Sequence, residues 1–409
     1  MLLSLAVILI TGIVFGFAFK KIHLPALTGM LIAGIIIGPH ALDLISPSLT
    51  DISTELRQIA LIIILTRAGL SLNLADLKKV GRPALLMCFV PSVFELIGVV
   101  LLAPRLLDVT VLDALIIGFV IAAVSPAVIV PRMLKISEEG YGIDKKIPQM
   151  ITAGTSIDDV FVIILFTALM TVYSGETIAA ADFDWIQIPI SVMTGIAVGV
   201  LTGLSLSILF KKAKIENIIK VITLLCISFI FITAENMTDP SIPFSGLLAI
   251  MTAGIILFKF NRPAAGEISL TYSKLWIPAE IIVFVLIGAA ADISYSLSAG
   301  IMTVVVIAAA LMFRAAGVFV CLLKTELNMT ERLFCMIAYM PKATVQATIG
   351  GIPLAMGLPC GPIVLAMAVI SILITAPLGA WAIEKSYKQL LRKDKDTIKN
   401  EEQMRDKGE

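Results

Sequence analysis

The chain has 409 residues, of which 58% are hydrophobic and 15% are charged, and its mean hydropathy is +1.01. A soluble domain carries about 25% charged residues, so this composition excludes a soluble protein and favours one that crosses a membrane several times. The net charge of +1 indicates no particular partner. We do not expect the protein to bind a nucleic acid.

Thirteen apolar segments follow one another along the chain, and each is interpreted as a membrane span. The first lacks the basic n-region and the small-residue cleavage site of a signal peptide, so we expect it to remain as a span. The predicted fold class is therefore an all-α polytopic membrane protein followed by a charged tail, 385–409. Its thirteen transmembrane helices have the approximate limits 2–19, 24–38, 56–72, 82–103, 111–135, 147–173, 187–210, 218–236, 242–258, 275–292, 299–323, 331–352 and 360–384.

Basic residues lie mostly on one side of the predicted membrane. Eighteen of them lie in alternate loops and eight in the tail, which together make 26 of the 31 in the chain. The opposite loops hold only Arg57 and Arg105, along with several acidic residues. Because cytoplasmic loops are enriched in Lys and Arg, we expect the N-terminus outside and the C-terminus in the cytoplasm. The predicted location is the plasma (inner) membrane, in contact with lipid.

Two segments carry proline beside polar residues near the middle of the membrane. The fifth contains Ser125-Pro126, and the twelfth contains Pro341-Lys342, followed by Gly350-Gly351. Proline removes a helical hydrogen bond and clashes with the preceding turn. The two segments are seven spans apart, an odd number, so they cross in opposite directions. This pattern is typical of inverted-topology repeats with discontinuous helices, as found in secondary transporters.

Seven ionisable side chains lie inside the predicted spans and away from their outermost residues, where each charge costs about 2.5–3.5 kcal/mol to insert. They are Arg67, Glu95, Asp158, Asp159, Glu280, Arg314 and Lys342. Buried charges are paired or functional. Similar depths predict three pairs, which are Arg67 with Glu280, Glu95 with Arg314, and Lys342 with Asp158. We expect the first two pairs to be structural ties, and Asp159 is left without a basic partner.

The adjacent aspartates point to ion or proton handling inside the membrane. Neighbouring residues of a helix are about 100° apart, so Asp158 can be held by a base while Asp159 faces a cavity. There Asp159 can exchange a proton for a hard monovalent cation such as sodium or lithium. Further oxygen ligands are expected from the hydroxyl groups of Ser125, Thr155 or Ser156, and from carbonyl groups freed where the fifth helix is broken.

These residues resemble the cation/proton antiporter superfamily, in particular the sodium/proton antiporters of its double-aspartate (NHA-like) branch. The resemblance covers nearly the whole chain and rests on five motifs, Arg67-Ala68-Gly69-Leu70, Ser125-Pro126-Ala127-Val128-Ile129-Val130-Pro131, Asp158-Asp159, Arg314, and Pro341-Lys342-Ala343-Thr344-Val345-Gln346. It implies a transporter that exchanges sodium or lithium for protons in ion transport and pH homeostasis, not an enzyme, with no cofactor. Asp159 is then the shared cation- and proton-binding carboxylate, and Asp158 is its partner, tied to a base.

The resemblance also implies an architecture. The protein is expected to form a homodimer in which a core domain moves like an elevator against a dimerisation domain. The core lies approximately within 56–173 and 275–384, and the dimerisation domain within 1–38 and 218–258, with 187–210 as a linker helix. The fifth and twelfth helices are expected to cross at their breaks, at Pro126 and Pro341.

One position departs from the family pattern. Many electrogenic members carry a lysine where this chain has Arg314, and arginine does not deprotonate in proteins. With Asp159 alone titrating, one proton is exchanged for one cation and transport is electroneutral. With Asp158 and Lys342 also titrating, the ratio is two to one. The sequence leaves both ratios open, as well as the choice among sodium, lithium and potassium.

Three other functions were weighed. A sodium-coupled symporter of an organic anion on a related fold is the alternative, although it needs a polar or aromatic substrate cavity. An intramembrane aspartyl protease needs two aspartates on facing helices, whereas Asp158 and Asp159 are neighbours on one helix. The third is a channel or sensor derived from the antiporter fold. Counterflow of cation against a pH gradient separates the antiporter from all three.

Overall fold

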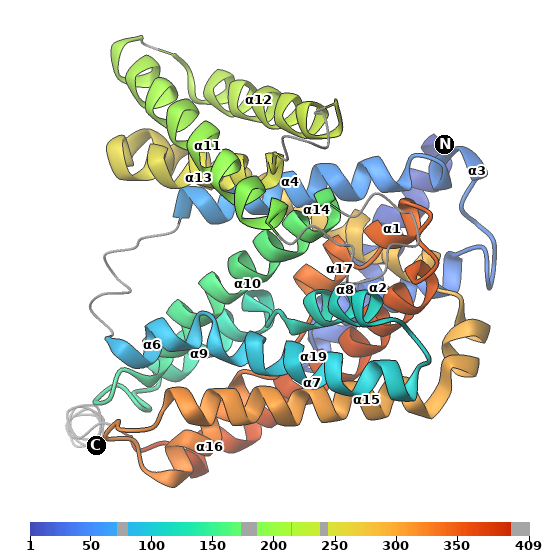
Figure 1. Cartoon of the computed structure of the whole chain (residues 1–409), viewed down its shortest axis with the longest axis vertical. Helices are drawn as coiled ribbons and strands as arrows, with labels where there is room; N and C mark the ends of the chain where they lie inside the picture. The colour runs from blue at the N-terminus through green and yellow to red at the C-terminus, as the bar shows by residue number, and fades with distance from the viewer. Residues whose placement is uncertain (72–80, 173–185, 214, 238–243, 394–409) are drawn as a thin grey trace, which may run out of the picture.

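A computed structural model describes residues 1–71, 81–172, 186–213, 215–237 and 244–393, and these ranges are almost entirely helical (Figure 1). The helices are α1 (Leu2–Lys21), α2 (Ala26–Ile37), α3 (Pro47–Thr50), α4 (Ser53–Ser71), α6 (Arg82–Met87), α7 (Val90–Leu106), α8 (Val111–Ala122), α9 (Pro126–Glu138), α10 (Ile147–Val172), α11 (Gln187–Lys212), α12 (Asn217–Met237), α13 (Gly246–Phe260), α14 (Arg262–Ala290), α15 (Ile293–Cys321), α16 (Met329–Ala338), α17 (Thr344–Ile349), α18 (Ile352–Ala355) and α19 (Gly361–Leu390).

Every predicted apolar segment coincides with a helix or with consecutive helices. Within the described ranges, nine helical stretches are long and apolar enough to cross a membrane, and α2 and α13 are shorter apolar helices. The chain is therefore an all-helical, multi-pass membrane protein. The predicted span 275–292 begins too late, because α14 starts at Arg262 after Asn261, whose side chain accepts a hydrogen bond from the Ala264 N–H group at 3.4 Å. Residue 72, residue 173, residues 242–243 and the tail from residue 394 lie outside the described residues.

One group of helices, the first group, consists of α1, α2, α4, α11, α12, α13 and α14. Its helices approach closely through small residues, as Gly195, Gly199 and Gly203 on α11 illustrate. They are spaced by four and face α13, and a Cβ atom on Gly199 would lie 2.6 Å from the Ala249 carbonyl oxygen. Gly34 on α2 meets the backbone of α14 in the same way. In a bilayer, such close contact supplies the dispersion energy that holds helices together.

The other group, the second group, consists of α6 to α10 and α15 to α19. Its most enclosed members are α8–α9 and α19. In their most apolar stretches, 67% and 72% of the residues are buried, whereas the corresponding share is 22% in both α1 and α12. Figure 1 shows α4, α11, α12 and α13 at one end of the molecule, α7, α15 and α16 at the other, and α10 running between them. The first discontinuous helix, α8–α9, therefore lies in the protected interior, and so does α17, all of whose residues are buried.

The grouping of two helices differs from the prediction. The segments 56–72 and 275–292 were expected in the core domain, whereas α4 and α14 pack mainly against each other and against α2 and α13. A Cβ atom on Gly69 of α4 would lie only 2.4 Å from the Met251 carbonyl oxygen of α13, so these two backbones are nearly in contact. Order along the chain does not reveal this packing. The division into domains that move relative to each other stays a prediction.

The chain beyond the predicted last span is partly built into the second group. Helix α19 continues to Leu390, and the Tyr387 hydroxyl donates a hydrogen bond to Glu139 at 2.6 Å. The Gly142 N–H group donates to the Arg392 carbonyl at 2.9 Å. The first residues of the predicted tail are thus fixed to the connection between α9 and α10.

Candidate functional site

Two interrupted helices meet in the second group. Helix α8 ends before an extended stretch and α9 begins at Pro126, while α16 ends at Ala338 and α17 begins at Thr344. The Ser125 N–H group donates a hydrogen bond to the Pro341 carbonyl at 2.8 Å, so the two extended stretches touch. Proline has no N–H group and favours the first turn of a helix, which explains the start of α9. The predicted breaks at Pro126 and Pro341 are confirmed.

Long polar side chains bind the carbonyl groups that the breaks release. The last carbonyls of a helix have no intrahelical partner. At the end of α8, the Ile121 carbonyl accepts a hydrogen bond from Lys342 at 2.5 Å and the Ala122 carbonyl accepts one from Arg314. The Ala123 carbonyl accepts one from the Gln346 amide at 2.8 Å. Arg314 also donates to the Tyr339 carbonyl at the end of α16, at 2.7 Å. Positive charge at these C-terminal ends is also favoured by the helix dipole.

Four buried charges form one connected network. Arg314 pairs with Glu95 and with Asp158, both at 2.8 Å, and Lys342 pairs with Glu95 at 2.7 Å. All four side chains are fully buried. The predicted pair Glu95–Arg314 is confirmed. The predicted pair Lys342–Asp158 is wrong, because Asp158 forms its ion pair with Arg314 and Lys342 forms its ion pair with Glu95.

The two aspartates have different surroundings. Asp158 accepts hydrogen bonds from the Ser92 hydroxyl, from Arg314, and from the Val124 N–H group at 3.1 Å, which involves both of its oxygens. Asp159 lines a cavity, and no described residue donates a hydrogen bond to its Oδ1 atom. The helical rotation of about 100° per residue separates the two carboxylates. The structure thus agrees with the expectation that Asp158 is tied to a base and Asp159 is not.

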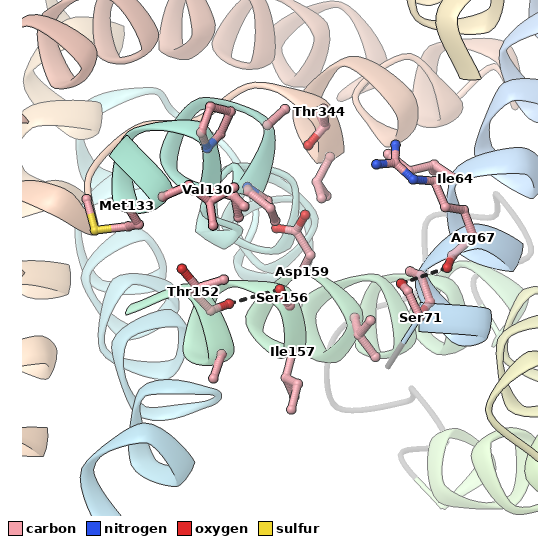
Figure 2. Close-up of a pocket in the computed structure, with 18 of the residues that line it drawn as sticks. Ile64, Arg67, Ser71, Val130, Met133, Thr152, Ser156, Ile157, Asp159 and Thr344 are labelled. Carbon is pink, nitrogen blue, oxygen red and sulfur yellow. Dashed lines mark hydrogen bonds between the residues drawn. The ribbon is translucent and has the colours of Figure 1, made fainter. Parts of the chain in front are cut away.

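The cavity lies between the two helix groups and has a volume of about 940 Å³. Figure 2 shows Asp159 among its lining residues, with Thr344 from α17 on one side and Arg67 from α4 on another. Residues at the end of α9 and the start of α10, including Ser137 and Gln149, also line it. Its polar lining side chains are Arg67, Ser71, Ser137, Lys146, Gln149, Thr152, Ser156, Asp159, Thr344 and Thr348.

The predicted oxygen ligands Ser125 and Thr155 do not line this cavity. Both are fully buried. The Ser125 hydroxyl lies 3.4 Å from the Thr344 hydroxyl, and the Thr155 hydroxyl donates to the Thr152 carbonyl at 3.1 Å. The third predicted ligand, Ser156, does line it, together with the hydroxyl groups of Thr152 and Thr344, which were not predicted.

Helical spacing relates Ser156 to Asp159 and could have identified Thr152 as well. Thr152 and Ser156 are seven and three positions before Asp159, which places all three on one face of a helix. Thr155 is three positions before Asp158 and shares the face of that residue. Thr344 follows the second break, and no feature of the sequence alone relates it to Asp159. Ser92 and Gln346, which support the network, were likewise not predicted as site residues.

The third predicted pair is not a contact pair. Arg67 lines the cavity from α4, and the half-buried Glu280 lies on α14. Their charges act on each other, but the ion pairs within 4.0 Å in the described part of the chain do not include them. The expected structural tie between these residues is therefore absent from this conformation.

Comparison with known proteins gives the family. The sequence matches the family described as "Sodium/hydrogen exchanger, transmembrane" over residues 5–384. "Sodium/hydrogen exchanger 9B2" of Homo sapiens is 31% identical over 393 residues, which cover 93% of this chain and 72% of the relative. "Sodium/hydrogen exchanger 9B1" of Homo sapiens is 30% identical over 372 residues, which cover 87% of this chain and 70% of the relative.

A solved structure has the same fold. The sodium proton antiporter MjNhaP1 from Methanocaldococcus jannaschii, determined at pH 8, superposes with a TM-score of 0.79 over 94% of this chain and 97% of that one. Its sequence identity is 19%, so this likeness shows an NhaP-like fold. The family match over residues 5–384 and the 31% identity to the human relative show that the chain belongs to the sodium/hydrogen exchanger family, whose members are transporters and not enzymes.

Proposed function

We propose that the chain exchanges sodium or lithium for protons across the membrane, and that the Asp159 carboxylate holds either the cation or the proton. The observation that carries this proposal is the contrast between two neighbouring carboxylates. Asp158 is bound by Arg314 and by the Ser92 hydroxyl, whereas Asp159 lines the cavity, and its Oδ1 atom has no hydrogen-bond partner within the described structure. A buried carboxylate without a basic partner favours a cation or a proton beside it.

The lining of the cavity suits a hard cation. Such ions take oxygen ligands, and Asp159 shares the cavity with the hydroxyl groups of Ser156, Thr152 and Thr344. A proton on Asp159 removes the negative charge that attracts the cation, so the two ligands compete for one carboxylate. This competition couples their opposite movements. The names of the relatives, which are sodium/hydrogen exchangers, support the same chemistry.

We assign the chain to the double-aspartate branch and propose a ratio of one proton to one cation. Arg314 stays charged, and Asp158 is occupied on both oxygens. Lys342 is held by Glu95 and by a backbone carbonyl, which supports a structural role. Asp159 is then the one group that changes its occupant. Exchange at this ratio is electroneutral, so its rate should not change when the membrane potential is clamped at different values.

The proposed mechanism is an elevator movement of the second group, α6 to α10 and α15 to α19, against the first. The second group contains both breaks and the aspartate pair, and the cavity lies along its boundary with the first group. Thirteen spans with inverted repeats and a homodimer formed through the first group complete the proposal. The N-terminus is placed outside and the tail in the cytoplasm of the plasma (inner) membrane, so the cavity opens to the cytoplasm.

The test is proton flux in proteoliposomes that hold a preformed pH gradient, with sodium, lithium or potassium added. Sodium or lithium should collapse the gradient with the wild-type protein. The control Glu267→Gln, which changes a carboxylate of α14 that is 49% exposed, should behave in the same way. Asp159→Asn should abolish the response while remaining folded. If no cation moves protons through folded wild-type protein, the proposal fails, and sodium-coupled uptake of organic anions becomes the experiment.

A further inference from the structure

Arg57 is a buried charge that the proposed exchange does not use. Its side chain lies in α4 and is 8% exposed. The Nε atom donates to the Ser53 carbonyl at 3.2 Å, and Nη2 donates to the Thr54 hydroxyl at 3.3 Å. The Nη1 atom has no hydrogen-bond partner among the described residues. The acidic residue whose charge acts on it is Glu55, which is exposed on the same helix.

The cavity has its mouth near Lys146 and Gln149, which are exposed lining residues, and Arg57 lies beyond the opposite end of the cavity. The residues of α4 that line the cavity begin at Ile64 and include Arg67. At 1.5 Å per residue, Arg57 is roughly 15 Å from Arg67 along the helix axis. The two helix groups, which are separated by the cavity near Arg67, are in contact at Arg57.

The contact is made with Gly351, between α17 and α18. A Cβ atom on Gly351 would lie 2.5 Å from Arg57 Nη1 and 3.3 Å from Ile287 of α14. The φ angle of Gly351 is −90°, which every residue type adopts, so the conformation does not require glycine. The absence of a side chain there leaves room for the guanidinium group.

The neighbouring end of α17 is its C-terminal end, where the helix dipole is negative. The last carbonyls of a helix lack intrahelical partners, and they are acceptors that suit an arginine. In the described conformation Arg57 contacts this end without donating to it.

We propose that Arg57 is a positioning residue of the transport cycle, and this inference rests on the proposed exchange. In the conformation with the cavity open, Arg57 closes the opposite side of the group boundary and keeps one nitrogen unpaired. When the second group moves, the same nitrogen pairs with the C-terminal carbonyls of α17. A buried donor without a partner is unfavourable, so Arg57 destabilises the cavity-open conformation relative to the other and promotes turnover.

The test measures conformation and transport separately. A cysteine at Ala153, which lines the cavity between its mouth and Asp159, is introduced together with Cys226→Ala, because Cys226 is the exposed thiol of the chain. Its rate of modification by a water-soluble thiol reagent reports the cavity-open population. Sodium-driven proton flux reports turnover, and thermal unfolding reports folding.

Arg57→Met keeps the length of the side chain and removes its charge. It should raise the ratio of cavity-open to cavity-closed protein about fivefold or more. This factor corresponds to the lower end of the free-energy cost of an unpaired buried donor. Modification of the cysteine should become faster and flux slower. Arg57→Lys, which keeps the charge, should stay closer to the wild type.

Gly351→Ala should act in the opposite direction, because its Cβ atom would lie 2.5 Å from Arg57 Nη1 in the cavity-open conformation and so disfavour that conformation. Modification should become slower, and adding Arg57→Ala should restore it. A merely structural Arg57 predicts altered unfolding temperatures with unchanged modification rates, and that result overturns the inference. If Arg57→Met does not fold, Gly351→Ala with and without Arg57→Ala decides the question. Absence of flux in the wild type contradicts the proposed exchange instead.

Discussion

At the residue scale, the site separates charges that hold the structure from one that is available to a ligand. Glu95, Asp158, Arg314 and Lys342 are two acids and two bases joined by contacts of 2.7–2.8 Å, so their formal charges cancel. Of the five charged side chains at the crossing of the broken helices, Asp159 is then the one outside these ion pairs. One monovalent cation or one proton neutralises it, which is the physical basis of the proposed ratio of one to one.

This separation predicts opposite roles for the two aspartates in stability. Asp158→Asn removes the ionised partner of Arg314 and should destabilise the protein by about 3–5 kcal/mol, as expected when one member of a buried pair is lost. Asp159→Asn removes a carboxylate without a basic partner, so it should leave stability unchanged or raise it. Thermal unfolding in detergent compares the two variants. Equal losses for both would contradict the assignment of Asp158 as the tied carboxylate.

The pairing within the network can be measured directly. A double-mutant cycle of Glu95→Gln with Lys342→Met should give a coupling energy within about 0.5–3 kcal/mol, the range for residues in contact. The cycle of Asp158→Asn with Lys342→Met should give a clearly smaller value, because Arg314 stands between those charges. A larger coupling in the second cycle would restore the pairing that depth alone had predicted.

The charged residues of the site could be predicted from the sequence, but their partners only in part. Charges in apolar segments are visible in any sequence because they are costly in a bilayer. Depth along a helix is one coordinate of a position, and the pairs depend also on the direction around the helix. Lys342 lies in a stretch without helical periodicity, where no rule of spacing gives that direction.

At the element scale, the breaks persist because side chains replace the missing helical hydrogen bonds. Arg314 binds carbonyls at the ends of both α8 and α16, and Gln346 binds the carbonyl of Ala123. Proline therefore locates each interruption, and the buried polar groups stabilise it. The thirteen apolar segments were recognised from hydropathy, whereas the assignment of α4 to the first group depends on backbone contacts that hydropathy does not contain.

Close packing of α11 on α13 gives a prediction with a matched control. Gly199→Ala places a Cβ atom 2.6 Å from a backbone oxygen of α13, so the helices must separate, and stability should fall by about 1–3 kcal/mol. Gly266→Ala adds a Cβ atom in α14 with no atom within 4 Å. It should be neutral or stabilise the protein by up to about 1 kcal/mol, the difference in helix propensity. Thermal unfolding decides, and equal effects would contradict the packing.

At the scale of the whole molecule, the cavity reaches one of the basic loops, the connection between α9 and α10. Lys146 lines the cavity, and it lies in one of the loops whose positive charges predict the cytoplasmic side. The sequence thus predicted an orientation, and the structure adds a cavity whose opening can be tested against that orientation.

Gln149 is exposed and lines the cavity near its mouth, which makes it a reporter of that side. With Cys226→Ala as the background, Gln149→Cys should remain active until a membrane-impermeant, positively charged thiol reagent modifies it. The added charge should then repel the cation and reduce exchange strongly. This loss is expected in everted vesicles, where the cytoplasmic face is accessible, and not in right-side-out vesicles.

Leu201→Cys on α11, which is 66% exposed on an apolar surface, is the control that the reagent should not inhibit. Inhibition from the outer face alone would reverse the proposed orientation, and inhibition from neither face would remove Gln149 from the path of the ion.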